Sequence, residues 1–134
     1  FLAHYPFWLA TSESTDTTVP TSGVGYTINN AGNAPTRIKV EITAPGAGIA
    51  AGNVQLAVTE TGELFKYTEA IAAADVLKVD NRYDTDDYII TNDGADAHVN
   101  FEGDFLTLAP GVNTVVFTGT ADTSIKIYWR GAWY

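Results

Sequence analysis

Apolar and polar residues alternate at every second position over much of this chain. The alternation is clearest where Ile38, Val40 and Ile42 are interleaved with charged residues, and it recurs in residues 54–58 and 125–129. In a β-strand successive side chains point to opposite faces, so each segment presents one apolar stripe for burial and one polar face to water. The pattern predicts three well-defined strands.

Weaker segments show the same tendency, and residues that favour turns (Gly, Pro, Asn and Asp) separate them. They are residues 24–28, 64–67, 76–79, 88–91, 97–101, 105–108 and 113–117. No helical periodicity is sustained, and the helix formers in residues 68–74 are expected to form a short connector. About ten short strands at regular spacing predict an all-β fold, a single antiparallel β-sandwich.

The alternating apolar residues are expected to meet in one core between two facing sheets. The predicted core consists of Ile38, Val40, Ile42, Val54, Leu56, Val58, Val115, Phe117, Ile125, Ile127 and Trp129. The sandwich is predicted to span residues 23–134 as one domain. Residues 11–22 are rich in Ser, Thr and Asp and are interpreted as a loop or linker, and residues 1–10 as a leading segment.

The charge of the chain restricts its partners. Sixteen acidic residues against seven basic ones give a formal net charge of −9, and the basic residues are scattered singly along the sequence. Such a surface repels phosphate backbones, so nucleic-acid binding is not expected. No apolar run is long enough for membrane insertion. The absence of cysteine excludes disulfides and thiolate metal sites.

Nothing in the sequence indicates an enzyme. The two histidines, His4 and His98, are far apart, and no Gly-x-Ser-x-Gly turn is present to hold a nucleophile. His98 is expected on the outer side of the strand predicted at residues 97–101, as an ordinary surface histidine. No cofactor is expected.

Acidic residues gather between positions 75 and 104, and the densest run suggests calcium ligands. The candidates for a metal are Asp80, Asp84, Asp86 and Asp87. The run lacks the glycine and the glutamate that a calcium-binding EF-hand loop requires at fixed positions. Aspartate is also common in turns for local reasons, so solvated turns without an essential metal are the favoured interpretation.

Two tryptophans are the candidates for binding a ligand or a partner. Trp129 continues the apolar stripe of its strand and is expected in the core, whereas Trp8 and Trp133 lie near the two ends of the chain. An exposed indole ring can stack on a sugar, and a buried one fills a core. A sugar platform and a purely structural role both remain open for this pair.

Three patches together resemble the C-terminal domain of siphophage distal tail proteins. Residues 1–8 resemble the aromatic and proline motif that begins that domain, with Tyr5 where aspartate is usual. Residues 103–115 contain its Leu-x-Pro-Gly-x-Asn-x-hydrophobic hairpin, and residues 125–133 end in its Trp-Arg-x-x-Trp strand. The three patches occur in the family's order and cover nearly the whole chain.

The resemblance implies a galectin-like or jelly-roll-like sandwich in a virion structural protein at the tail tip, made in the cytoplasm of the host bacterium. In that family a preceding barrel domain builds a hexameric ring, on which residues 1–10 would pack or to which they would link. The implied partners are other tail proteins (tail tube, hub, fibre or receptor-binding protein). The alternative is a carbohydrate-binding module that attaches to a glycan of the host surface.

Overall fold

The computed structural model describes residues 8–82 and 89–134 of the chain. Within them, strands and one short 3-10 helix follow in this order: β1 (Trp8–Leu9), β2 (Ser14–Thr18), β3 (Gly25–Asn30), β4 (Thr36–Thr43), β5 (Val54–Val58), β6 (Glu63–Tyr67), β7 (Val76–Asp80), β8 (Ile89–Asn92), β9 (Ala95–Asp96), η1 (His98–Asn100), β10 (Phe101–Gly103), β11 (Thr107–Leu108), β12 (Gly111–Gly119), β13 (Ser124–Trp129) and β14 (Ala132–Trp133).

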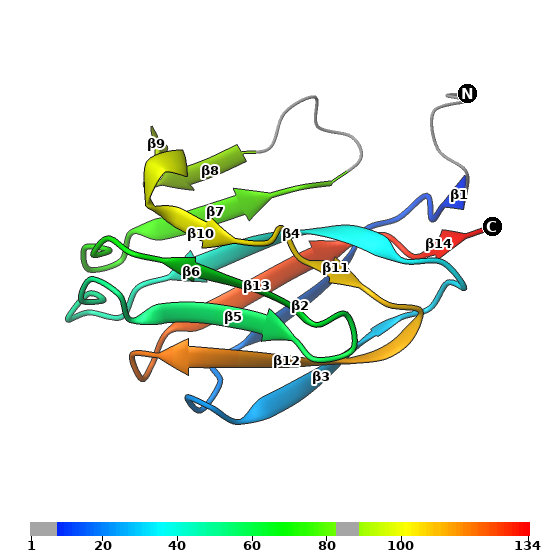
Figure 1. The fold of residues 1–134 in the computed structure, drawn as a ribbon, viewed down its shortest axis with the longest axis horizontal. Helices are drawn as coiled ribbons and strands as arrows, with labels where there is room; N and C mark the ends of the chain where they lie inside the picture. Colours follow the sequence, from blue (N-terminus) through cyan, green and yellow to red (C-terminus); the bar gives the residue numbers. More distant parts are fainter. Residues whose placement is uncertain (1–7, 83–88) are drawn as a thin grey trace.

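The strands form an antiparallel β-sandwich, as the alternation predicted (Figure 1). The small sheet has five strands in the order β10-β6-β5-β12-β3. The large sheet has seven, in the order β2-β13-β4-β7-β8-β9, with β11 paired to β4. A separate two-stranded sheet joins β1 to β14, and it is called the terminal sheet below. No helix among the described residues has the length and apolar character of a membrane span.

One hydrophobic cluster lies between the two sheets, and it contains every residue of the predicted core. Ile42 of β4 has Ile125 and Leu77 as its partners on the neighbouring strands, while Phe117 pairs with Leu56 in the small sheet. All five of these side chains are fully buried. Burying one such side chain contributes about 1.5–3 kcal/mol, so this cluster is the main source of stability.

The interpretation of residues 11–22 as a loop is wrong for Ser14–Thr18. These residues form β2, an edge strand whose Thr15 and Thr17 pair with Tyr128 and Lys126 of β13. Threonine is β-branched and suits a strand, but an edge strand made only of Ser, Thr and Asp lacks the apolar alternation that marks the others.

The strand predicted for residues 97–101 is also wrong, because η1 takes its place until Phe101. The backbone N–H of His98 donates to Oδ1 of Asp96 at 3.2 Å, and that of Asn100 donates to the carbonyl oxygen of Ala97 at 3.1 Å. Such local bonds compete with a strand ladder. Val99 consequently lies 90% exposed instead of pointing inward.

The turn before β12 is fixed by a buried asparagine. Oδ1 of Asn113 accepts the N–H of Ala109 at 2.8 Å, and its Nδ2 donates to the carbonyl oxygens of Ala109 at 2.8 Å and Gly111 at 3.0 Å. Gly111 has φ +86°, a conformation that favours glycine. The Pro-Gly-x-Asn sequence therefore forms a turn that is closed by the hydrogen bonds of the Asn113 side chain, which are called the Asn113 clasp below.

Candidate functional site

The terminal sheet brings together the two tryptophans that the sequence offered as binding residues. Trp8 of β1 and Trp133 of β14 are direct partners across the strand pair, and Leu9 pairs with Ala132. The N–H of Ala10 donates to the carbonyl oxygen of Gly131 at 2.8 Å and extends the pairing. Residues from the two ends of the chain thus form one surface element beside the sandwich (Figure 1).

Small residues hold the terminal sheet against the rest of the molecule. The N–H of Ala34 donates to the carbonyl oxygen of Ala132 at 2.9 Å. A Cβ on Gly32 would lie 1.8 Å from that same oxygen, and a Cβ on Gly131 would lie 2.9 Å from the ring of Trp133. Larger side chains at either glycine would therefore push the terminal sheet away.

Aromatic rings are exposed on this sheet. Trp8 is 64% exposed, Trp133 is 37% exposed and the neighbouring Tyr134 is 73% exposed. The three residues are called the terminal aromatic surface below. Tryptophan and tyrosine are enriched at protein interfaces because they combine a large apolar area with a polar tip. Tyr134 was not singled out from the sequence, although its place beside Trp133 was a usable signal.

Asp80, the first of the four metal candidates, is paired with a cation. Its Oδ1 accepts Nε of Arg82 at 3.0 Å and its Oδ2 accepts a terminal nitrogen of Arg82 at 2.9 Å. The other terminal nitrogen of Arg82 lies 2.5 Å from Oε2 of Glu13, with which it forms a second ion pair. Burial opposes the charge of Asp80, but the hydrogen bonds and charge of Arg82 outweigh it and lower the pKa of the carboxyl.

The other metal candidates, Asp84, Asp86 and Asp87, lie outside the described residues. Among residues 8–82 and 89–134, no group of three or more His, Cys, Asp and Glu side chains is arranged to hold a metal. The absence of an essential metal stays a prediction.

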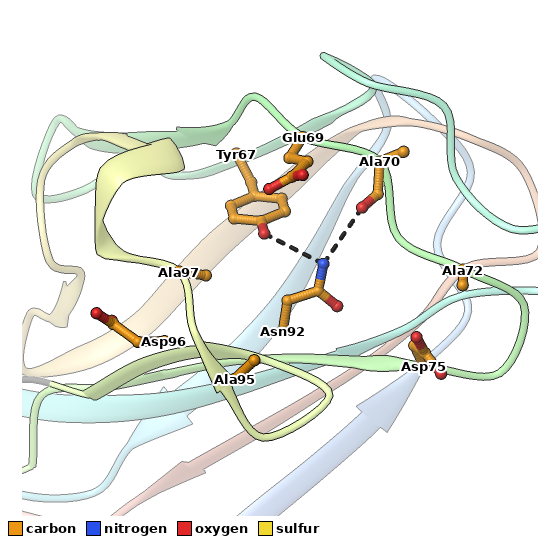
Figure 2. A pocket seen from close by; sticks show the side chains of 9 residues that line it. All are labelled: Tyr67, Glu69, Ala70, Ala72, Asp75, Asn92, Ala95, Asp96 and Ala97. Atoms are coloured by element: carbon orange, nitrogen blue, oxygen red, sulfur yellow. Dashed lines mark hydrogen bonds between the residues drawn. The ribbon is translucent and has the colours of Figure 1, made fainter.

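A polar pocket of about 300 Å³ opens at the end of the sandwich where β9 and η1 lie (Figure 2). Glu69, Asp75 and Asp96 contribute carboxylates to its lining. Nδ2 of Asn92 donates to Oη of Tyr67 and to the carbonyl oxygen of Ala70, both at 3.2 Å. The tyrosine ring is buried, so it offers no flat platform to a sugar.

The structure describes one of the two histidines, His98, which lies on η1. His98 pairs with the exposed carboxylate of Asp96, and the hydrogen bond from the imidazole lowers the pKa of that carboxyl. His4 lies outside the described residues.

Four basic residues that are scattered along the sequence lie on one face of the folded sheet. Arg37 and Lys39 of β4, Lys78 of β7 and Lys126 of β13 alternate with buried residues and therefore share the outer face of the large sheet. These four residues, of the seven basic ones in the chain, are called the cationic face below. Strand pairing brings them together from distant positions in the sequence.

Tyr128 is the centre of the cationic face. The ammonium nitrogen of Lys39 lies 3.9 Å from the centroid of its ring, and that of Lys126 lies 4.9 Å away. The phenol donates to Oε1 of Glu41 at 2.6 Å. Burial and this hydrogen bond raise the pKa of Tyr128, so the ring stays neutral and keeps both lysines by cation–π contact.

The sandwich and its surfaces define a structural or binding module, and comparison with known proteins identifies its family. A family model described as siphovirus-type tail component, C-terminal domain, matches residues 31–133. The chain belongs to this family, as the three sequence patches indicated, and is a structural component of a phage tail.

A solved structure shows the same fold. The crystal structure of the SPP1 Dit protein aligns with a TM-score of 0.70 at 11% sequence identity, over 98% of this chain and 50% of that chain. The chain therefore spans about half the length of SPP1 Dit, which is described as a paradigm of the hub adsorption apparatus in phages that infect Gram-positive bacteria. No curated protein matches the sequence.

Proposed function

We propose that this chain is the peripheral β-sandwich domain of a distal tail protein and works at the tail-tip hub or baseplate through contacts with other tail proteins. The observation that carries the proposal is the terminal aromatic surface. Trp8 and Tyr134 are more than half exposed, although the sandwich has a complete core without them. Exposed aromatic rings of this size are typical of a surface that a partner covers.

The position of the terminal sheet supports the same function. It lies where the chain enters and leaves the sandwich, so a domain that precedes residues 1–10 would reach it first. The family model describes a C-terminal domain, and the SPP1 Dit chain is about twice as long. Tail tube, hub, fibre and receptor-binding proteins are the candidate partners. No catalytic step and no cofactor enter the proposal.

The test is assembly of the phage that encodes this chain, with Trp8→Ala and Trp133→Ala combined. Truncating an interface anchor costs about 2 kcal/mol or more of binding free energy, so tail tips are expected to be incomplete by electron microscopy. Val99→Ala is the matched control, because Val99 is 90% exposed on η1 at the other end of the sandwich (Figure 1). Normal tail tips and full infectivity of the double variant would refute the proposal.

The second candidate, a carbohydrate-binding module for attachment to the host surface, is favoured by the same pair of exposed tryptophans. Two neighbouring indole rings can stack on a sugar chain. Titration of the chain with cell-wall polysaccharide separates the two functions. Saturable binding that the Trp8 and Trp133 variants abolish, with assembly unchanged, would favour the glycan.

A further inference from the structure

We propose that the cationic face of the large sheet docks an acidic surface of a neighbouring tail protein. The inference rests on the proposed function, since it names the chemistry of one partner. A chain of net charge −9 has only seven basic residues, and the fold places Arg37, Lys39, Lys78 and Lys126 on one side of one sheet. Charge complementarity therefore points to an anionic partner at this face.

The lysines of this face are available to a partner. The ion pairs of Arg82 with Glu13 and Asp80, and of His98 with Asp96, do not include these lysines. Glu41 is the acidic residue between Lys126 and Lys78 in the strand register, and its carboxylate already accepts the hydroxyl of Tyr128. Lys39 also lies opposite Asp80, whose carboxylate is held by Arg82. Among the described residues of β4 and β7, the two carboxylates nearest these lysines, Glu41 and Asp80, therefore already accept hydrogen bonds from other side chains.

The geometry also fixes the lysines in place. Neighbouring strands lie about 4.8 Å apart, so Lys126, Glu41 and Lys78 form a row across three strands. Lys39 and Lys126 converge on the ring of Tyr128. Side chains held by a ring lose less conformational entropy on binding than free lysines do, which makes the face a prepared docking surface.

A folded acidic protein fits this face better than a long polyanion. A phosphate polymer or a nucleic acid would extend beyond the sheet and meet the acidic remainder of the chain. A compact acidic patch would meet the lysines alone, because charges farther away than about 8 Å are screened at physiological salt.

The first test uses the isotope-labelled chain and a short poly-glutamate peptide. We expect amide shifts in the magnetic resonance spectrum to be confined to β4, β7 and β13, and binding to weaken about tenfold between roughly 20 and 150 mM salt. Tighter binding of polyphosphate or duplex DNA at the same face would overturn the assignment to a protein. Salt-sensitive dimers of the chain alone, seen by light scattering, would assign the face to a second copy instead.

The second test compares matched neutral substitutions. Lys126→Gln removes one charge from the cationic face, and Lys66→Gln removes one from the exposed side of β6 in the small sheet. We expect Lys126→Gln to bind the peptide about fourfold more weakly and Lys66→Gln to bind it with unchanged affinity. A unit charge about 5 Å from its partner in water changes the affinity by about that factor. The Lys39→Gln and Lys126→Gln double variant should lose about tenfold or more.

Equal effects at Lys66 and Lys126, or shifts that map outside the large sheet, would refute the inference. The outcome is independent of the assembly test, which changes Trp8 and Trp133 and leaves every lysine in place. If the peptide-binding tests fail while the Trp8 and Trp133 variants still assemble defective tail tips, the inference of an acidic partner is refuted and the proposed function stands.

Discussion

Replacing Asn113 with alanine tests whether the buried clasp of the Pro-Gly turn stabilises the fold. The side chain is fully buried and makes three hydrogen bonds, to the N–H and carbonyl of Ala109 and to the carbonyl of Gly111. At about 1 kcal/mol net for each bond, Asn113→Ala should cost about 3 kcal/mol. With an unfolding entropy of about 2.1 cal/mol/K per residue over 134 residues, Tm should fall by roughly 10 °C.

Urea denaturation followed by circular dichroism gives the free energy of unfolding, and calorimetry gives Tm. The control is Asn29→Ala, because Asn29 is an exposed asparagine on the adjacent strand β3, and its loss should change stability by less than about 0.5 kcal/mol. A cost below about 1 kcal/mol for Asn113→Ala would show that water replaces the clasp. The reasoning from buried hydrogen bonds would then be refuted.

Four further predictions concern the core, the acid response, the terminal sheet and metal binding. Ile127→Ala should cost about 2–5 kcal/mol in urea denaturation, because the side chain is fully buried, and a value below about 1 kcal/mol would place it outside the core. The pKa of Asp80 is lowered, so the stability from its pairing with Arg82 is complete above the unfolded pKa of about 4 and is lost as pH falls through the folded value. Asp80→Asn should therefore lower stability near neutral pH and weaken its fall in acid, and an unchanged pH profile would contradict this. Gly32→Ala should cost about 1–3 kcal/mol and shift tryptophan fluorescence, since its Cβ would collide with Ala132, whereas an unchanged spectrum would contradict the close approach. Tm should be equal in excess calcium and in excess chelator, and a rise that saturates at one equivalent would reveal a metal site.

The main strands could be predicted because the alternation of apolar and polar residues in each one shows which of its faces is buried. In β4, β5 and β13 the buried positions alternate with the others, so apolar residues at every second position reveal both strand and inward face. The same rule missed β2, which pairs along its backbone but carries only polar side chains. It also failed at Val99, where the local hydrogen bond from the backbone N–H of His98 to the carboxylate of Asp96 favours a turn.

The surfaces could be predicted only as separate residues. Trp8 and Trp133 were both candidates, but their pairing depends on which ends of the chain meet, and sequence spacing carries no information on that. The cationic face depends on the register that aligns Lys126 and Lys78 with the same residue of β4. A shift of one position in either pair would move a lysine to the opposite face, so no reading of the sequence alone could find this face.

The terminal sheet also determines how the molecule responds to mechanical load. Trp8 and Trp133 are the outermost partners of an antiparallel pair, so the chain enters β1 and leaves β14 on the same side of the terminal sheet. Tension between the two ends therefore peels β1 from β14 one hydrogen-bonded pair at a time, and then acts on Ser14 and Trp129, where β2 meets β13. Peeling requires far less force than shearing all bonds of a strand together. Under a pull the terminal sheet would open first, as a compliant hinge that spares the sandwich behind it.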